Sequence, residues 1–523
     1  MSNNNKILLP VALAIFMAAG FLLGSKLSYT ETNNFISNTN KNKLNKLIDF
    51  LENEYVDSLN TDSIVDLTVN GILEKLDPHS VYISKNQWQQ VSEELQGNFV
   101  GIGINFYMLN DTLAVVKPLP NGPSYKAGIK SGDRILYANN KKLFGKNLPT
   151  DSLYAILKGK PNTTVNLKVF RKSANKFLNI NLKRDIIPVK SVDFYGMLNQ
   201  KVGYIKMNRF AENTYDEFII ALKDLKDKKA TSLILDLRDN GGGYLEIAAQ
   251  IADEFLKENE IIVKTKNKKN LTEVTKATTK GIFEKEKIII LINENSASAS
   301  EIIAGAIQDN DRGIVVGRRS FGKGLVQREM PLGDGSAVRL TIARYYTPSG
   351  RSIQKPFADK KDEYFNEFEK RFLSGELYQA DSIKVSDSLK FKTKNGRIVY
   401  GGGGITPDVY VPLEKNHAAE ATQMVMQSGI VSNFVFKELD KNRIKFSKLN
   451  QINLKSEIFN NKAYINNFIN YIHKNGLYIQ LDANKEKVLN YLYAEFVRQL
   501  FTDAAYYKII LEEDNMVKKA LSL

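Results

Sequence analysis

The chain contains no cysteine and only three histidines among its 523 residues. The absence of cysteine excludes a thiol nucleophile, a cysteine-based zinc or iron–sulfur site, disulfide bonds and a lipidated N-terminal cysteine. It leaves the redox compartment open, because a large domain can fold without disulfides in an oxidising space. The histidines are His79, His417 and His473. We expect no metal site and no cofactor, and a catalytic serine would need a base from another residue type.

The length and composition of the chain indicate a large globular protein of several domains. A chain of 523 residues exceeds one hydrophobic core, and its 43% hydrophobic and 25% charged content is typical of globular protein. The net charge of +15 raises the question of nucleic acid. The lysines, however, are scattered among Asn, Asp and Glu and form no stripe with interleaved aromatic residues. We therefore expect a solvated basic surface and no nucleic-acid partner.

An apolar run near the start of the chain predicts a membrane anchor. Ile7–Gly24 is uncharged, is flanked by Lys6 and Lys26, and approaches the roughly 20 residues that a membrane span needs. A cleaved signal peptide would carry small residues just past such a run, whereas the trio Ala18–Gly20 lies inside it. This favours an uncleaved anchor in the inner membrane over a cleaved signal peptide. The catalytic part would then lie in the periplasm, or be exported in another way.

Changes of pattern along the rest of the chain predict four further segments. Helical spacing after a polar tether ends at the sequence LDPHS, where His79 is expected to be a turn residue. Short β-rich runs follow, then alternating β and α units, and finally helical segments without a chemical motif. The expected boundaries are 1–30 for the anchor, 31–90 for the tether and helical segment, 91–187 for the β-rich module, 188–412 for the α/β core and 413–523 for the helical C-terminal region.

The β-rich module carries a glycine-rich loop before a strand. The sequence FVGIGINF, followed by PSYKAGIKSGDRIL, resembles a PDZ domain. Its loop Gly101-Ile102-Gly103 can point backbone N–H groups at the terminal carboxylate of a peptide, and the strand from Ile104 can pair with the peptide tail. Apolar terminal residues would then be preferred, with Ile104, Leu153 and Leu157 as pocket candidates. The alternative is that the glycines only form a tight turn.

Two strand ends in the α/β core carry small residues where ligand groups usually lie. LILDLRDNGGGYL places Gly241–Gly243 between a strand and a helix, which leaves backbone N–H groups without side-chain cover. NENSASASEIIAG places Ser296, Ser298 and Ser300 at the next strand end. Ser298 and Glu301 also fit a helix capping box, so capping and catalysis both remain open from this motif.

A lysine is the candidate base. Lys323 lies in RRSFGKGLVQ beside apolar residues. At an unperturbed pKa of about 10.4, only roughly one lysine in 2,500 is neutral at pH 7, but burial can lower that pKa by about 3–5 units. A phosphate-binding lysine is the competing interpretation, although the loop lacks the G-x-x-x-x-G-K-[ST] pattern.

Three motifs in order resemble the carboxyl-terminal processing peptidases, also called tail-specific proteases. They are SASASE, GRRSFGKGLVQ and RYYTPSGRSIQ, and the similarity runs from Leu76 to Val409, including LDPHS and DLRDNGGG. The resemblance implies a multidomain fold of the α/β plus β class. It would comprise a crotonase-like or ClpP-like α/β peptidase core and an inserted PDZ-like domain. The apolar run and the helical spacing add to this an N-terminal membrane anchor and helical N- and C-terminal segments, of which the C-terminal one lies outside the similarity.

The same resemblance implies the roles of individual residues. Ser298 would be the nucleophile, Lys323 the general base, and Gln327 the residue that orients the lysine. The backbone N–H groups of Gly243 and Ala299 would form the oxyanion hole.

The implied function is that of a serine endopeptidase with a Ser–Lys dyad, acting on exported proteins whose apolar C-terminal tails bind the PDZ-like module. The partners would be protein or peptide substrates and the membrane, with an adaptor protein or a homo-oligomer as further candidates. Two other functions compete: a PDZ scaffold with a degenerate peptidase domain, and a crotonase-like acyl-thioester enzyme.

Overall fold

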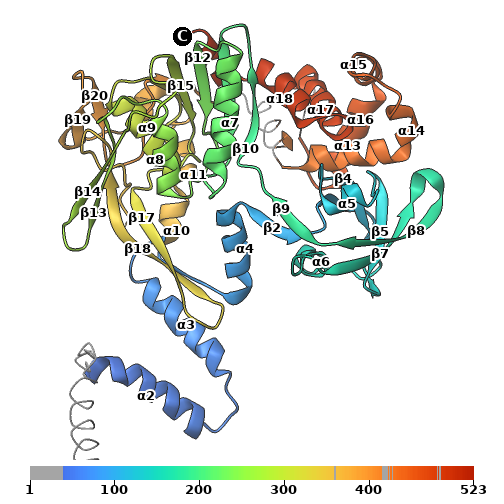
Figure 1. Cartoon of the computed structure of the whole chain (residues 1–523), viewed down its shortest axis with the longest axis horizontal. Coiled ribbons are helices and arrows are strands. Elements are labelled where there is room, and N and C mark those ends of the chain that lie inside the picture. Colours follow the sequence, from blue (N-terminus) through green and yellow to red (C-terminus); the bar gives the residue numbers. More distant parts are fainter. Residues whose placement is uncertain are drawn as a thin grey trace, which may run out of the picture. The chain divides into compact units, whose positions relative to one another are not determined.

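The computed structural model describes residues 39–523 except 358–360, 415–421, 423–424, 427, 480 and 482–483 (Figure 1). The apolar run Ile7–Gly24 and His417 lie outside the described residues. Within the described part of the chain, no helix is both long and apolar enough to cross a membrane. The chain divides into two compact units, Met1–Glu74 and Lys75–Leu523.

The first unit contains two amphipathic helices. They are α2 (Thr39–Glu54) and α3 (Thr61–Leu73). Helix α3 begins where Asn60 caps it, because the Asn60 side chain accepts a hydrogen bond from the N–H of Ser63. Both helices lie in the stretch where the spacing of apolar residues predicts a helical segment.

A six-stranded sheet forms the centre of the second unit. Its strand order is β10-β11-β12-β15-β16-β21, and only the β10–β11 pair is antiparallel. The continuous apolar runs of β12 and β15 suit a parallel sheet that is covered on both faces. The strands are β10 (Val192–Met197), β11 (Val202–Met207), β12 (Ser232–Asp236), β15 (Lys287–Ile292), β16 (Ile314–Gly317) and β21 (Val409–Tyr410).

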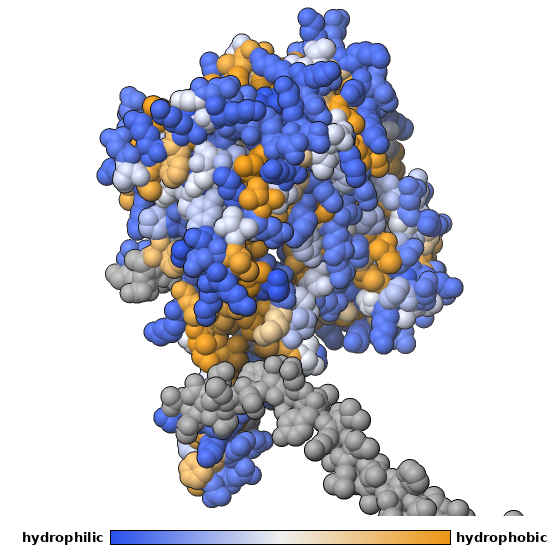
Figure 2. Space-filling model, turned by 60° about the vertical axis from the view of Figure 1, so that its left-hand side comes forward, coloured by the Kyte–Doolittle hydropathy of each residue, from blue (hydrophilic) through white to orange (hydrophobic). Residues whose placement is uncertain are grey.

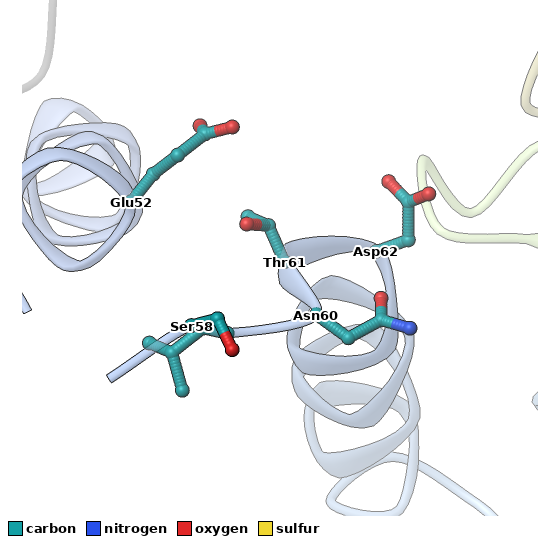
Figure 3. Close-up of a pocket in the computed structure, with 6 residues that line it drawn as sticks. Glu52, Ser58, Asn60, Thr61 and Asp62 are labelled. Atoms are coloured by element: carbon teal, nitrogen blue, oxygen red, sulfur yellow. The ribbon is translucent and has the colours of Figure 1, made fainter.

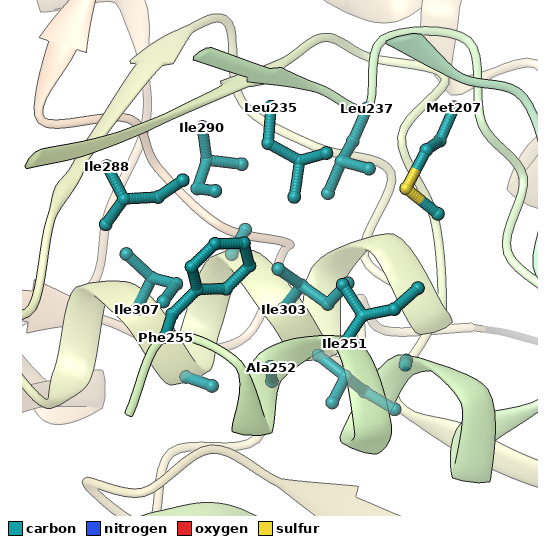
Figure 4. Close-up of a cluster of buried hydrophobic side chains, with 14 of the residues drawn as sticks. Met207, Leu235, Leu237, Ile251, Ala252, Phe255, Ile288, Ile290, Ile303 and Ile307 are labelled. Atoms are coloured by element: carbon teal, nitrogen blue, oxygen red, sulfur yellow. The ribbon is translucent and has the colours of Figure 1, made fainter. Parts of the chain in front are cut away.

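Alternate residues of each strand feed two separate cores. In β15, Ile288 and Ile290 point to one core, whereas Ile289 and Leu291 point to the other. Figure 4 shows the first core, where strand residues meet Ile303 and other side chains of the covering helices. That face is covered by α7 (Thr214–Asp227), α8 (Leu245–Asp253) and α9 (Ala299–Asp309).

The opposite face of the sheet is covered by the last helices of the chain. Met516 and Val517 are 5% and 1% exposed and pack with Leu291 of β15 and Val316 of β16. They belong to α19 (Asn515–Leu521), which follows α18 (Asp503–Glu512). The C-terminal region therefore completes the apolar core on this face of the six-stranded sheet.

A second, antiparallel sheet contains β17 and β18, the strands that follow the loop around Lys323 (320–324, called the lysine loop below). Strand β18 pairs with β17, β13 and β1. The bounds are β1 (Val81–Ile83), β13 (Ile261–Asn267), β14 (Thr272–Lys276), β17 (Leu325–Pro331) and β18 (Ala337–Tyr346). Nearby lie the short helices α10 (Lys361–Phe365) and α11 (Glu367–Leu373) and the hairpin β19 (Lys390–Lys392) and β20 (Ile398–Tyr400).

The PDZ-like module is a sheet with its own core. The order is β3-β4-β5-β7-β8, so β3 is an edge strand, and the ribbon of β2 and β9 leads in and out. Its elements are β2 (Asn98–Gly101), β3 (Ile104–Met108), β4 (Leu113–Pro118), α5 (Pro123–Lys126), β5 (Asp133–Ala138), β6 (Lys141–Lys142), α6 (Thr150–Leu157), β7 (Thr164–Arg171), β8 (Lys176–Lys183) and β9 (Asp185–Pro188). Helix α4 (Lys85–Gln96) precedes the ribbon.

The helical C-terminal region has a separate apolar core. Phe434, Phe468, Leu492 and Phe496 are buried in it. Its helices are α13 (Ile430–Lys441), α14 (Arg443–Phe446), α15 (Gln451–Asn460), α16 (Ala463–Lys474) and α17 (Lys485–Leu500), followed by α18 and α19. The described residues from Ile430 onward are thus mainly helical, the structure that their pattern predicts.

Polar side chains cover most of the molecular face shown in Figure 2, and apolar side chains gather in its lower part. Large apolar side chains that remain exposed include Met330, Leu332 and Leu340 on the β17–β18 hairpin.

Candidate active site

Ser298 lies in a strained turn between β15 and α9. Its backbone has φ +56° and ψ −112°, a conformation that residues other than glycine rarely adopt. The side chain is half-buried. Strained residues of this kind cluster at catalytic sites, where the surrounding structure holds them in place. The turn thus singles out Ser298 by its geometry.

The other two serines of the trio are structural. Ser296 and Ser300 are fully buried. The Ser296 hydroxyl donates to the carbonyl of Leu237 at 2.8 Å, and the Ser300 hydroxyl donates to the carbonyl of Asn240 at 2.9 Å. Both therefore tie the serine turn to the glycine loop that follows β12.

Glu301 joins the serine turn to the lysine loop. One carboxylate oxygen accepts hydrogen bonds from the N–H of Ser298 at 2.8 Å and of Lys323 at 2.9 Å. The other accepts from the N–H of Gly322 at 2.7 Å and the hydroxyl of Ser320 at 2.5 Å. The side chain is completely buried. Burial raises the pKa of Glu301, and these hydrogen bonds act in the opposite direction.

One half of the capping box suggested by the sequence is therefore present, because the Glu301 carboxylate accepts a hydrogen bond from the N–H of Ser298. Its contacts with the lysine loop, 19 to 22 residues further along the chain, are an additional role that the local motif did not predict.

The amine of Lys323 is held by a chain of hydrogen bonds. Its Nζ donates to Oε1 of Gln327 at 2.7 Å, and Nε2 of Gln327 donates to the carbonyl of His79 at 2.6 Å. Burial, followed by the positive charge of Arg339, lowers the pKa of Lys323 to about 8. No hydrogen bond joins Ser298 Oγ to Lys323 Nζ within the described residues. The hydroxyl of Tyr345 nevertheless ties the two backbones, at 2.6 Å from the Lys323 carbonyl and 3.1 Å from the Ser298 carbonyl.

An irregular pairing directs Gln327 toward the lysine. The register of β17 against β18 shifts between Val326 and Gln327. Such bulges reorient a side chain and are common beside active sites.

The LDPHS turn supports Gln327 from the other side. Asp77 accepts hydrogen bonds from the N–H groups of His79 at 3.0 Å and Ser80 at 3.1 Å, which fixes the turn and the carbonyl that Gln327 contacts. The imidazole of His79 lies 2.9 Å from the hydroxyl of Tyr364. His79 is a turn residue, as expected, but the sequence did not reveal that its carbonyl supports the lysine.

The glycine loop after β12 packs against the serine turn. Gly242 and Gly243 have φ +102° and +146°. A Cβ atom added to Gly242 would lie 2.9 Å from Cβ of Ser298 and 3.0 Å from the nitrogen of Ala299. Within the described residues, the N–H groups of Gly243 and Ala299 have no hydrogen-bond acceptor in the protein. Both groups are therefore free to bind an oxyanion.

The glycine loop of the PDZ-like module is buried, and it leads directly into the edge strand β3. Gly101, Ile102 and Gly103 are buried, and Gly103 has φ +71°. The carbonyls of Ile102 and Gly103 accept hydrogen bonds from the N–H groups of Ser124 and Leu119, each at 3.0 Å. These two hydrogen bonds hold the loop against the segment that runs from the end of β4 into α5.

The apolar candidates of this module have different environments. Ile104 is half-buried at the start of β3. Leu153 and Leu157 are 0% and 4% exposed and belong to the module's core, so they do not line an open pocket in this structure. The rings of Phe106 on β3 and Tyr154 on α6 lie with their centroids 5.4 Å apart. The two aromatic side chains thus lie between the edge strand and α6. The sequence pattern did not single out these two rings.

A hollow in the first unit contains none of these residues. It has a volume of about 570 Å³ and lies within Met1–Glu74 (Figure 3). Its lining is Glu52, Ser58, Leu59, Asn60, Thr61 and Asp62. Among the residues with described positions, no cluster of His, Asp and Glu side chains could hold a metal ion.

Comparison with known proteins assigns both main domains. Residues 201–359 match the model of peptidase family S41, and residues 100–182 match the PDZ domain. A family of unknown function matches residues 422–503.

Similar proteins include the carboxy-terminal-processing protease of Bartonella bacilliformis, which is 36% identical over 65% of this chain and 80% of its own length. Carboxy-terminal processing protease CtpB of Bacillus subtilis is 32% identical over 73% of this chain and 79% of its own length. A solved structure titled photosystem II D1 C-terminal processing protease aligns at 23% identity, with 71% of this chain and 86% of that chain covered and a TM-score of 0.37.

The mixed α/β fold and the site define a serine-type peptidase that carries a PDZ domain. The chain belongs to peptidase family S41, in the group of the carboxy-terminal processing proteases. It is a serine protease, and the resemblance noted in its motifs is confirmed.

Two neighbouring glycines allow the close packing of the glycine loop on the serine turn to be tested, because only one of them lies against Ser298. Gly242→Ala would strain a left-handed backbone and push its methyl group into Ser298 and Ala299. We expect proteolysis to fall by about 10²–10³, the range for loss of one oxyanion donor. Gly241→Ala meets no atom within 4 Å. Its activity on an unfolded protein such as casein should stay within about threefold of the parent. Equal activities of the two variants would contradict the close packing.

Proposed function

We propose that the protein is an endopeptidase that uses Ser298 and Lys323 as a catalytic dyad. The observation that carries the proposal is the buried carboxylate of Glu301, which holds the backbone N–H groups of both residues. The Gln327 contact and the lowered pKa of Lys323 add to it, because a base has to be partly neutral at working pH.

The proposed reaction is acyl transfer through a covalent intermediate. Oγ of Ser298 attacks the peptide carbonyl while Nζ of Lys323 takes its proton. The N–H groups of Gly243 and Ala299 bind the oxyanion. The C–N bond then breaks as Lys323 returns the proton to the leaving amine, and water, activated by the same lysine, hydrolyses the acyl-enzyme.

Substrate binding has to complete this arrangement. Nζ of Lys323 donates to Gln327 in the free protein, and it must come within hydrogen-bond reach of Oγ of Ser298 for proton transfer. Catalytic hydrogen bonds are often long in free enzymes and shorten in the substrate complex.

Substitution of the dyad tests the proposal directly. Ser298→Ala and Lys323→Ala should each abolish proteolysis, and a fluorophosphonate probe should label the parent at Ser298. Ser296→Ala removes a buried structural hydroxyl and should retain substantial activity and labelling. Mass spectrometry identifies the labelled residue. Absence of labelling in the folded parent would favour a non-catalytic PDZ scaffold, and full activity of Lys323→Ala would exclude the dyad.

The pH dependence reports the protonation of Lys323. Because the base accepts a proton only when neutral, kcat/KM should rise as pH increases through about 8 and then level off. Roughly one lysine in ten would be neutral at pH 7. Arg339→Gln removes a positive charge that lowers this pKa, so the midpoint should move to higher pH. A profile that stays flat across this region, or a midpoint that moves down, would contradict the assignment.

We also propose that the PDZ domain binds the C-terminal tail of protein substrates. The edge strand β3 has an unpaired side that can accept a peptide strand, and the loop Gly101-Ile102-Gly103 precedes it. Apolar tails suit the half-buried Ile104 and the rings of Phe106 and Tyr154.

Amidation of the tail tests this recognition. A peptide substrate with a free terminal carboxylate should be cleaved faster at subsaturating concentration than the same peptide with an amidated terminus. Gly103→Val should reduce this difference, because the residue has φ +71° and its Cβ would lie 3.1 Å from Ile187. Probe labelling of Ser298 serves as the control for folding. Equal cleavage of both peptides at all concentrations would remove the tail-binding role.

The apolar run Ile7–Gly24 supports a further proposal about location. We propose that residues 1–30 anchor the protein in the inner membrane with the catalytic domain in the periplasm, where an adaptor or a second copy could join it. Protease added to cells with an opened outer membrane should then digest the catalytic domain, and full protection would contradict this location.

A further inference from the structure

The helical C-terminal region packs against the PDZ domain. This region matches a family of unknown function and carries no catalytic motif. Its helix α13 nevertheless contacts β3 and β5 of the PDZ domain through charged and aromatic side chains. These contacts connect two parts of the chain that lie about 300 residues apart.

Asp440 is the polar centre of this contact. The residue is 8% exposed and lies near the end of α13. Its carboxylate is 2.7 Å from Nη2 of Arg134 and 2.9 Å from Nζ of Lys172, both from the PDZ domain. The same lysine also donates to the Asp440 carbonyl at 2.8 Å. Lys172 is half-exposed, whereas Arg134 and Asp440 are largely buried, so the pair with Arg134 is the better shielded tie between α13 and β5.

Phe436 is the apolar centre of the same contact. It is 1% exposed, and its ring centroid lies 5.6 Å from that of Tyr107 on β3. The guanidinium of Arg134 lies 6.0 Å from the same ring. The hydroxyl of Tyr107 donates to Ser432 at 2.7 Å. Aromatic packing thus accompanies the ion pairs over one continuous surface.

The other end of the C-terminal region is fixed to the catalytic sheet. Met516 and Val517 pack into its core. Asp514 lies 2.7 Å from Nη1 of Arg238, and the same guanidinium pairs with Asp236 at the end of β12. Arg238 directly precedes the sequence DNGGG, which holds Gly243. The region therefore bridges the PDZ domain and the strand that leads into the glycine loop.

We infer that the C-terminal helical region is a dock that holds the PDZ domain in the position from which a bound tail reaches Ser298. The inference rests on the proposed tail recognition and extends it to a region without an assigned role. The Lys323–Gln327–His79 contacts and the Glu301 contacts are all present while the dock is closed. Docking is therefore compatible with an assembled site.

The dock contacts the tail-binding strand from the side that a tail does not use. Phe106 of β3 faces Tyr154 of α6, whereas the next residue, Tyr107, faces Phe436 of α13. Neighbouring side chains of a strand point to opposite faces. A tail can therefore add to the edge of β3 without displacing α13.

Asp440→Asn tests the dock, because it removes the shared negative charge and keeps the size of the side chain. The measurement is KM and kcat for one peptide substrate with a free terminus and for its amidated form. If undocking leaves a tenth to a fifth of the molecules competent to deliver a tail, KM for the free-acid peptide should rise about five- to tenfold. The amidated peptide should be cleaved as by the parent, kcat should stay within about twofold, and Ser298 should keep its labelling rate.

Glu457→Gln is the matched control. Glu457 pairs with Lys445 at 2.7 Å and with Tyr464 at 3.0 Å inside the same region, so this variant loses a carboxylate without touching the PDZ domain. It should keep the parent preference for the free-acid peptide. Ser432→Ala removes the acceptor of the Tyr107 hydroxyl and should raise KM in the same direction by a smaller factor. If Asp440→Asn loses probe labelling of Ser298, it has failed to fold. Ser432→Ala then tests the dock in its place.

Two results would overturn the dock. The first is a parent-like preference in folded Asp440→Asn and Ser432→Ala. The second is faster cleavage of the free-acid peptide by these variants, which would make the contact inhibitory. A parent enzyme that cleaves both peptides equally would instead refute the tail recognition on which the inference rests.

Discussion

The active site depends on one buried carboxylate. Glu301 lies in the first turn of α9 and accepts hydrogen bonds from the N–H of Ser298 and from the loop that carries the amine of Lys323. A buried carboxylate is costly unless donors surround it, and here four donors from two segments satisfy it. The serine turn and the lysine loop are therefore held together because the buried carboxylate of Glu301 needs hydrogen-bond donors from both.

This requirement also explains the strain at Ser298. A positive φ at a non-glycine residue costs free energy, and it persists only where the surroundings hold it. The N–H bond to Glu301, the Tyr345 hydroxyl and the buried side chains of Ser296 and Ser300 provide that support. The three alternating serines thus divide into one half-buried residue in a strained conformation and two buried residues with structural hydroxyls.

The sequence was sufficient for the parts of the site that depend on local pattern. Continuous apolar strands predicted a parallel sheet, and small residues after its strands identified the ends where Ser298 and Gly243 lie. The motifs also led to Lys323. Apolar neighbours suggested its burial, which the structure shows together with a lowered pKa.

Contacts between distant segments could not be derived in this way. The carbonyl of His79 meets Gln327 across 248 residues, and Asp440 meets Arg134 across 306 residues. No periodicity or local motif encodes such partners. Leu153 shows a related limit, because an apolar residue on a helix beside a groove can face either the groove or the core, and here it faces the core.

The position of α19 also affects when the core of the six-stranded sheet can be completed during synthesis. Ser298 and Lys323 emerge from the ribosome long before residues 515–521, since translation proceeds from the N-terminus. Until α19 is made, Leu291 and Val316 lack the apolar side chains that cover them in the finished sheet. A nascent chain that already contains Ser298 and Lys323 therefore still lacks part of this core. The apolar cover of β15 and β16 is thus supplied by residues that are translated well after Lys323.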